Sequence, residues 1–219
     1  MLVSHRYKFI FAKAKKVAST TTEAYLERYC VSPEEEISYK HEHSSDERIT
    51  EYGIIGSRMN GDKGSRRWYN HKVTKDIKND LGEDIWKSYS KIVNIRNPYD
   101  LAVSLYHDTG NKSKNTKDFE RFLKMKNVQN ILLSNRKIWT LDDKYVFDYY
   151  IRQEFLEEDL NTMIKEIGLP LYNDSLPNYK VIKRDHYSIY YNQESKNIIS
   201  DIYAKELDLF NYNFNPILE

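Results

Sequence analysis

Residues 8–29 read KFIFAKAKKVASTTTEAYLERY and combine an apolar run, a basic turn rich in hydroxyl groups and an amphipathic segment. Residues 8–11 carry the aromatic and β-branched side chains that are typical of a short buried strand. Thr20 is followed three residues later by Glu23, a capping-box pattern that predicts a helix beginning at Thr20. The stretch therefore predicts a strand, a loop and a helix in succession.

The turn between this strand and this helix predicts an anion-binding site. A helix N-terminus presents unpaired backbone N–H groups and the positive end of the helix dipole. The lysines and hydroxyl groups that surround it are Lys13, Lys15, Lys16 and residues 19–22. We expect a phosphate or a sulfate to bind here, and the alternative is a capped helix whose lysines are simply solvated. Residues 8–29 contain no glycine, so the pattern GxxxxGK[ST] is absent and an ordinary nucleoside-triphosphate loop is disfavoured.

Length and composition indicate one soluble enzyme-sized domain. The 219 residues suit a single domain over residues 1–219, and the net charge of +1 argues against a dedicated nucleic-acid binder. No segment has the pattern of a signal peptide, and no run approaches the roughly 18 apolar residues of a membrane span, so we expect a cytoplasmic protein. Cys30 is the single cysteine, which excludes an internal disulfide and a cysteine-built zinc site.

Residues 91–95, KIVNI, predict the clearest buried strand and lead directly into the next helix. Asn97 is a good N-cap and Pro98 stands at the first helical position that proline prefers, so residues 99–107 should be helical. Arg96 then ends the strand, and Ser104 lies two turns into the helix.

Ligands of open α/β sheets gather beyond the carboxyl ends of the strands. This rule places Arg96 in the same crevice as the Lys16 loop, so both residues should face one anionic ligand.

The remaining elements predict a sheet covered by helices. Strands that alternate with helices indicate an α/β protein with three layers, α/β/α, around a mainly parallel central sheet. The further expected helices span residues 74–81, 83–89, 117–124, 129–135, 156–167 and 193–208, and the further expected strands span residues 36–39 and 145–151.

Residues 51–70 are rich in glycine and arginine and are expected to form an irregular, basic loop. Trp68 and Tyr69 in this loop predict a platform for a sugar ring or an anionic acceptor, and the alternative is a solvated loop anchored by Trp68. A second basic loop carries Lys183 and Arg184, which either close over a cofactor or are simply solvated. His107 and His186 are expected to be structural histidines.

The stretch Lys16-Val17-Ala18-Ser19-Thr20-Thr21 resembles the 5′-phosphosulfate loop of sulfotransferases that use 3′-phosphoadenosine 5′-phosphosulfate (PAPS). Residues 95–108, IRNPYDLAVSLYHD, are similar to the 3′-phosphate motif of the same family, in which an arginine and a serine grip the phosphate. Lys15 stands where the family has a proline, and the missing glycine also departs from the family pattern. Residues 68–98, 149–160, 186–191 and 203–212 look like the corresponding regions of bacterial and viral carbohydrate-type members.

The resemblance implies a sulfotransferase fold, similar to that of P-loop nucleotide kinases, and the transfer of a sulfuryl group from PAPS to a hydroxyl acceptor. The acceptor is expected to be a carbohydrate, with a lipid, a tyrosyl peptide or a small metabolite as alternatives, and the product is adenosine 3′,5′-bisphosphate (PAP). No metal is required. The oligomeric state is not predicted. The rival interpretations are a nucleotide or small-molecule kinase and a non-catalytic phosphate-binding protein.

The site residues follow from matching the motifs. Lys16 is expected to neutralise the leaving oxygen, and His71 is the candidate base because a near-neutral pKa suits the removal of a proton from an alcohol. His41, Glu42 and His43 are alternative bases. The residues expected to bind the donor are Lys15, Lys16, Ser19, Thr20 and Thr21 on its 5′ side, Arg96 and Ser104 at the 3′-phosphate, and Lys183 and Arg184 in the closing loop.

Overall fold

The computed structural model describes residues 1–35, 46–58, 66–172, 176 and 184–215. The chain divides into two compact units, which are described separately: the first contains Met1–Ile95 and Arg136–Lys180, and the second contains Arg96–Asn135 and Val181–Glu219. The expectation of one domain over residues 1–219 stays a prediction.

The first unit is built on a six-stranded mixed sheet. Its strand order is β3-β4-β1-β2-β5-β8. The parallel pairs β2–β5 and β5–β8 confirm the α/β class, whereas β1, β3 and β4 add antiparallel pairs that were not predicted. Only a short turn separates β1 from β2, and such a connection permits an antiparallel pair alone. The strands are β1 (Leu2–Ser4), β2 (Phe9–Ala12), β3 (Arg48–Ile49), β4 (Gly53–Ile55), β5 (Ser90–Ile95) and β8 (Tyr149–Arg152).

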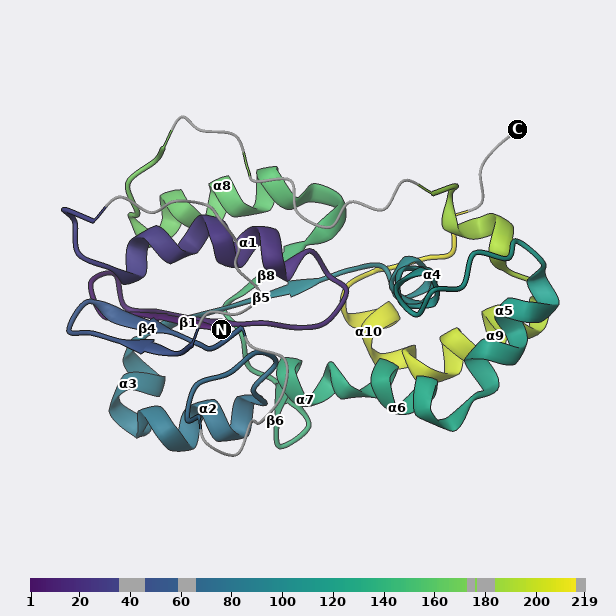
Figure 1. Ribbon diagram of the computed structural model, residues 1–219, viewed down its shortest axis with the longest axis horizontal. Coiled ribbons are helices and arrows are strands. Elements are labelled where there is room, and N and C mark those ends of the chain that lie inside the picture. Colours follow the sequence, from purple (N-terminus) through teal and green to yellow (C-terminus); the bar gives the residue numbers. More distant parts are fainter. Residues whose placement is uncertain (36–45, 59–65, 173–175, 177–183, 216–219) are drawn as a thin grey trace. The chain divides into compact units, whose positions relative to one another are not determined.

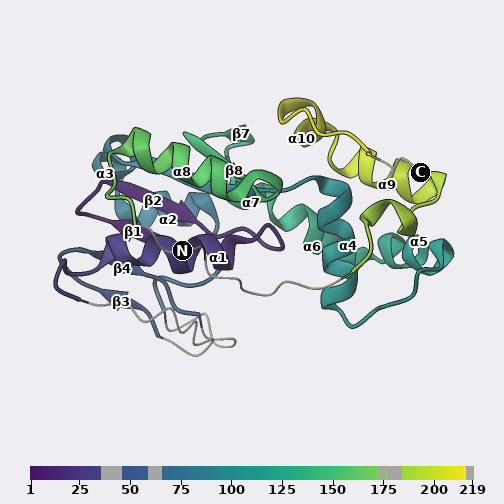
Figure 2. The ribbon, with the colours of Figure 1, turned by 90° about the horizontal axis from the view of Figure 1, so that it is seen from above.

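Helices cover both faces of this sheet. In Figure 1, α1 (Ser19–Leu26) and α8 (Leu156–Ile167) lie over one face, and α2 (Thr74–Leu81) and α3 (Glu83–Ser88) lie over the other. Figure 2 shows α1 and α8 from above, with β1 and β2 visible between them. The α/β/α layering of the first unit is as expected. Its other elements are η1 (Glu27–Cys30), α7 (Arg136–Trp139), β6 (Thr140–Leu141), β7 (Lys144–Tyr145) and η2 (Gln153–Phe155).

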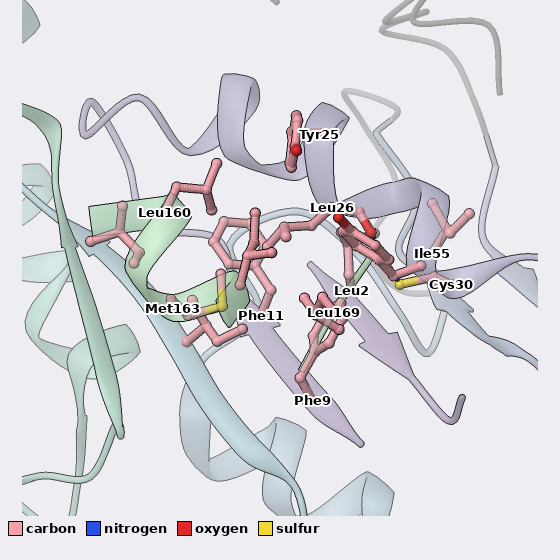
Figure 3. Packing of buried hydrophobic residues seen from close by; sticks show 14 of the residues in the cluster. Leu2, Phe9, Phe11, Tyr25, Leu26, Cys30, Ile55, Leu160, Met163 and Leu169 are labelled. Carbon is pink, nitrogen blue, oxygen red and sulfur yellow. Dashed lines mark hydrogen bonds between the residues drawn. The ribbon is translucent and has the colours of Figure 1, made fainter. Parts of the chain in front are cut away.

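The main hydrophobic core lies between the sheet and the α1–α8 layer (Figure 3). Phe9 and Phe11 of β2 point into it, and Leu26 of α1 with Leu160 and Met163 of α8 pack against them. All five side chains are buried. Burial of a side chain of this size contributes about 1.5–3 kcal/mol, so β2 is anchored firmly just before the candidate loop.

Gly53 lies where β4 passes close to two other segments. A Cβ atom at this position would lie 2.3 Å from the carbonyl oxygen of Val3 and 2.9 Å from that of Cys30. Both neighbours are backbone atoms, so the strand can pair with β1 only because residue 53 is glycine. The expectation of an irregular segment over residues 51–70 is therefore wrong at β4.

The regular elements among the described residues of the second unit are all helices. Asn97 accepts a hydrogen bond from the backbone N–H of Tyr99, and Pro98 is the first helical residue, which confirms the predicted start of α4. The single helix expected over residues 193–208 is interrupted at Tyr203, whose buried hydroxyl donates to the carbonyl oxygen of Leu132 at 2.7 Å. The elements are α4 (Pro98–Asp108), α5 (Thr116–Lys124), α6 (Lys126–Ser134), η3 (Tyr187–Tyr190), α9 (Gln193–Ile202) and α10 (Ala204–Leu209).

Candidate anion-binding sites

The turn before α1 adopts an unusual backbone conformation. Lys16 has a φ of 62° and Ala18 has a φ of 58°, while Val17 between them does not have a positive φ. Such alternation turns successive backbone N–H groups toward a common point and forms an anion-binding concavity. A residue with a side chain is disfavoured in the left-handed region by about 1–2 kcal/mol, so this glycine-free turn is strained. Strain of this kind concentrates at binding and catalytic sites.

The predicted capping box is absent. The helix begins at Ser19, one residue earlier than expected, and no side chain caps it. Glu23 instead lies fully buried and accepts from the Met1 ammonium at 2.7 Å, from Lys13 Nζ at 2.7 Å and from Arg58 Nε at 3.0 Å. Burial alone would raise the pKa of Glu23, but the three cations hold that pKa well below its usual range.

This buried cluster reduces the number of cations available at the predicted anion-binding turn. Lys13 and Arg58 are both buried against Glu23, so neither is available to an external anion. The expected role of Lys13 in the anion-binding turn is therefore wrong, and Arg58, which lies in the segment expected to be a basic loop, is buried. Lys15 and Lys16 are partly exposed at the turn itself.

Ser19 is the most informative residue of the turn. It is 3% exposed, and its Oγ has no hydrogen-bond partner in the part of the chain that the structure describes. A buried hydroxyl without a partner costs about 1–3 kcal/mol, so such a group in a native protein calls for an explanation. An anion bound at the start of α1 would supply the missing acceptor. Thr20 is partly exposed and Thr21 is buried on the same first turn.

Thr22 has a different function from the one its place in the hydroxyl run suggests. Its Oγ1 accepts a hydrogen bond from Asn94 Nδ2 of β5 at 2.9 Å, and both residues are fully buried. This contact joins the first turn of α1 to the central strand and so fixes the position of the loop before it.

His71 lies beside the same loop. Its Nδ1 is 2.9 Å from the carbonyl oxygen of Lys13. Because a carbonyl oxygen only accepts, Nδ1 carries the proton and Nε2 carries the lone pair. Burial lowers the pKa of His71 to about 4, so the expectation of a near-neutral pKa is wrong. His71 also has a positive φ of 59°. It does not cap α2, whose N-cap is Val73.

Of the predicted stacking platform, Trp68 is buried and Tyr69 is partly exposed. Trp68 is only 3% exposed, and Lys72 Nζ lies 5.7 Å from the centre of its ring and 4.8 Å from that of Tyr69. Lys72 also pairs with Asp80 at 2.7 Å. Trp68 therefore anchors its segment, as the alternative interpretation proposed. Residues 36–39, His41, Glu42 and His43 lie outside the described residues.

The second unit holds a separate cluster on α4, formed by Arg96, Asp100, Ser104 and Arg184 and called the α4 cluster below. Arg96 donates from Nε and Nη2 to Asp100 Oδ2, at 2.8 Å and 2.6 Å. Arg184 donates from Nη2 to Asp100 Oδ1. The arginine side chains are 12% exposed and that of Asp100 is 16% exposed. Burial alone would raise the pKa of Asp100, but the two guanidinium groups hold it below its usual value.

Ser104 lies one turn beyond Asp100 on the same helix face. It is 8% exposed, and its hydroxyl makes no hydrogen bond with any residue that the structure describes. The structure thus brings together Arg96, Ser104 and Arg184 of the predicted set, while Lys183 lies outside the described residues. Asp100 was missed, although its spacing of four residues from both Arg96 and Ser104 was a visible signal.

The two histidines expected to be structural have partners within the second unit. His107 Nε2 lies 2.9 Å from the hydroxyl of Tyr190, and His186 Nδ1 lies 2.9 Å from Ser188 Oγ. The further expectation that Lys16 and Arg96 face one ligand joins residues of different units, and it stays a prediction.

The described residues hold no helix that is long and apolar enough to cross a bilayer, and no group of three or more histidine, cysteine or acidic side chains arranged to hold a metal ion. The chain matches no family model, no curated protein and no solved structure.

Proposed function

We propose that this protein is a sulfotransferase that uses PAPS as its donor and a hydroxyl group, first of all that of a carbohydrate, as its acceptor. One observation carries the proposal: a strained turn at Lys16 and Ala18 leads to the buried hydroxyl of Ser19, which has no partner in the described part of the chain, and His71 is hydrogen-bonded to the same loop. The arrangement combines an anion site with a neutral imidazole.

The residues of the turn fit a phosphate or a sulfuryl group. Ser19 lacks an acceptor among the described residues, the positive φ values of Lys16 and Ala18 are typical of anion-binding turns, and Lys15 and Lys16 supply positive charge. A kinase of the ordinary type needs a glycine-rich loop and magnesium ligands. The glycine-free turn therefore favours sulfuryl transfer.

The predicted donor-binding residues of the first unit have two proposed roles. The donor supplies the sulfuryl group. Lys16 neutralises charge that develops on the leaving oxygen, while Lys15, Ser19, Thr20 and Thr21 hold the 5′ side.

His71 Nε2 receives the proton of the acceptor hydroxyl, and the bond from Nδ1 to Lys13 holds the ring in one tautomer. With a pKa of about 4, His71 is unprotonated at neutral pH and is a weak base. Its contribution to transfer then comes mainly from its position, since a weak base accepts the proton only as the hydroxyl reacts.

The α4 cluster is the proposed site of the donor's 3′-phosphate. Arg96 and Arg184 offer guanidinium groups, which suit phosphate because they present paired N–H donors. Ser104, which is 8% exposed, offers a hydroxyl that makes no hydrogen bond with the described residues.

Thermal stabilisation by the product tests the donor assignment. PAP should raise the melting temperature of the wild type far more than ATP with magnesium does. Ser19→Ala should lose most of the shift caused by PAP, whereas Ser88→Ala, at an exposed serine of α3, should keep it. Stabilisation by ATP with magnesium alone would identify a kinase instead. Release of PAP in the presence of a glycan panel then tests transfer itself.

A further inference from the structure

The α4 cluster contains one carboxylate, that of Asp100, between two guanidinium groups that attract anions, and this distribution of charge can select a ligand. We propose that the α4 cluster binds a phosphate monoester in its singly protonated form, and that Asp100 makes it reject sulfate and disfavour the dianion. The identity of the monoester as a 3′-phosphate rests on the proposed function.

Asp100 has hydrogen-bonding capacity that the described residues do not use. A carboxylate has about four lone-pair sites. Three of them accept N–H groups, two from Arg96 and one from Arg184. Asp100 accepts no other hydrogen bond from the described residues, so one site remains for a donor that a ligand brings.

The neighbouring hydroxyl is that of Ser104. Ser104 follows Asp100 by one helical turn, is more than nine-tenths buried and has no hydrogen-bond partner among the described residues. The two side chains therefore have opposite hydrogen-bonding capacities: Asp100 can accept one more hydrogen bond, and Ser104 can donate one. A singly protonated phosphate offers both an O–H donor and oxygen acceptors.

Phosphate monoesters and sulfate differ in whether they carry a proton near neutral pH. A phosphate monoester loses its second proton near pH 6, so its singly protonated form is present at and below neutral pH. Sulfate carries no proton in this range and meets Asp100 only with negative oxygens. A like charge placed beside a ligand is a recognised means of rejecting it, and the Asp100 carboxylate carries the same sign of charge as sulfate. Asp100 stays ionised throughout, because both guanidinium groups favour its charged form.

One of the titratable groups near Asp100 offers a competing explanation for a pH-dependent affinity. Arg96 and Arg184 face it directly. Tyr191, which follows η3, is kept neutral because burial raises its pKa. His107 lies one turn beyond Ser104, and burial, with Arg184 and Lys112 nearby and Asp185 acting in the opposite direction, lowers its pKa. His107 could itself bind a proton in acid and attract anions, so it needs a variant of its own.

Adenosine 3′-monophosphate is the probe, titrated calorimetrically from about pH 5.5 to about pH 8, a range that brackets the second ionisation of the phosphate. In the wild type the affinity should fall by up to about tenfold per pH unit above that ionisation. Inorganic sulfate should fail to compete. In Asp100→Asn the pH dependence should flatten and sulfate should compete. Asp201→Asn, the same charge change at an exposed position of α9, should behave as the wild type does.

Two results would overturn the proposal: affinity for the monophosphate that is undetectable or rises with pH in the wild type, or sulfate competition equal in wild type and Asp100→Asn. His107→Asn should retain the pH dependence, and its loss there would assign the effect to His107. If Asp100→Asn fails to fold, the wild-type profile and His107→Asn still decide. Selective binding of the monophosphate without any release of PAP from PAPS would leave this inference standing while the proposed function failed.

Discussion

His71 Nδ1 and the carbonyl oxygen of Lys13 lie 2.9 Å apart, which joins the segment before α2 to the loop before α1. The contact fixes the tautomer, and burial lowers the pKa of the ring to about 4. His71 is therefore unprotonated at neutral pH, and its Nε2 carries a lone pair that can accept a proton.

His71→Ala should keep the affinity for PAP near that of the wild type and lower sulfate transfer by roughly two to four orders of magnitude, the usual contribution of a positioned base. In the wild type, transfer should fall in acid only near pH 4, because the pKa is lowered to about that value, and this limb should vanish in the variant. His5→Ala, at another histidine of the first unit, is the control. Unchanged turnover per folded molecule in His71→Ala would remove the catalytic assignment.

Two substitutions at Lys16 separate strain from function. Both Lys16→Ala and Lys16→Gly should lose turnover more than donor affinity, since the lysine acts on charge that grows in the transition state. Lys16→Gly should exceed Lys16→Ala in free energy of unfolding by about 1 kcal/mol, because glycine adopts a positive φ readily. Chemical denaturation and rate assays on the same samples measure both. A worse effect of Lys15→Ala would show that the loop register is displaced by one residue.

Glu23→Gln should lower the free energy of unfolding by about 3–5 kcal/mol, because it leaves buried cations without their carboxylate. Glu35→Gln, which removes an exposed pair with Arg48, should cost about 0–1 kcal/mol. The pKa of Glu23 is depressed in the folded protein, so its stabilisation is complete above the ordinary value of 4.5 and is lost as the pH falls below it. The difference between wild type and Glu23→Gln in urea denaturation should accordingly shrink in acid. Equal effects of the two substitutions would contradict this account.

Arg96→Ala should weaken PAP binding by about 1.5–3 kcal/mol, the range for hydrogen bonds to charged groups, and Ser104→Ala should weaken it less. Calorimetric titration measures both values. Arg121→Ala, at a side chain that is 78% exposed in the same unit, serves as the control. Unchanged affinity in Arg96→Ala would withdraw the 3′-phosphate assignment.

Local signals made much of the fold predictable. The cap at Asn97, the proline at residue 98 and the glycine that ends α8 act within a few residues of the sequence, and the elements they bound were predicted closely. β5 was recognisable because it is continuously apolar at its centre. In contrast, β1 and β4 are three residues each and exist through pairing with distant strands, which no local window reveals.

Tertiary contacts also explain the errors at the candidate sites. The spacing of Thr20 and Glu23 is that of a capping box, but Glu23 is drawn inward by the Met1 ammonium and Arg58, which are distant in sequence. The same burial removed Lys13 from the anion site. His71 was singled out by residue type and stays a prediction, and its low pKa depends on burial, which the sequence does not display.

The packing around Gly53 separates two kinds of evolutionary constraint. No larger residue fits there without moving the backbone of β1 or η1, so any related chain that keeps this sheet should keep the glycine whatever reaction it performs. The pairing of β4 with β1 does not depend on the side chains of Lys16, Ser19 and His71, and a relative that has lost the activity is free to replace them. Substitution at residue 53 would therefore report a changed fold, and substitution at residues 16, 19 and 71 beside an unchanged glycine would report a changed chemistry.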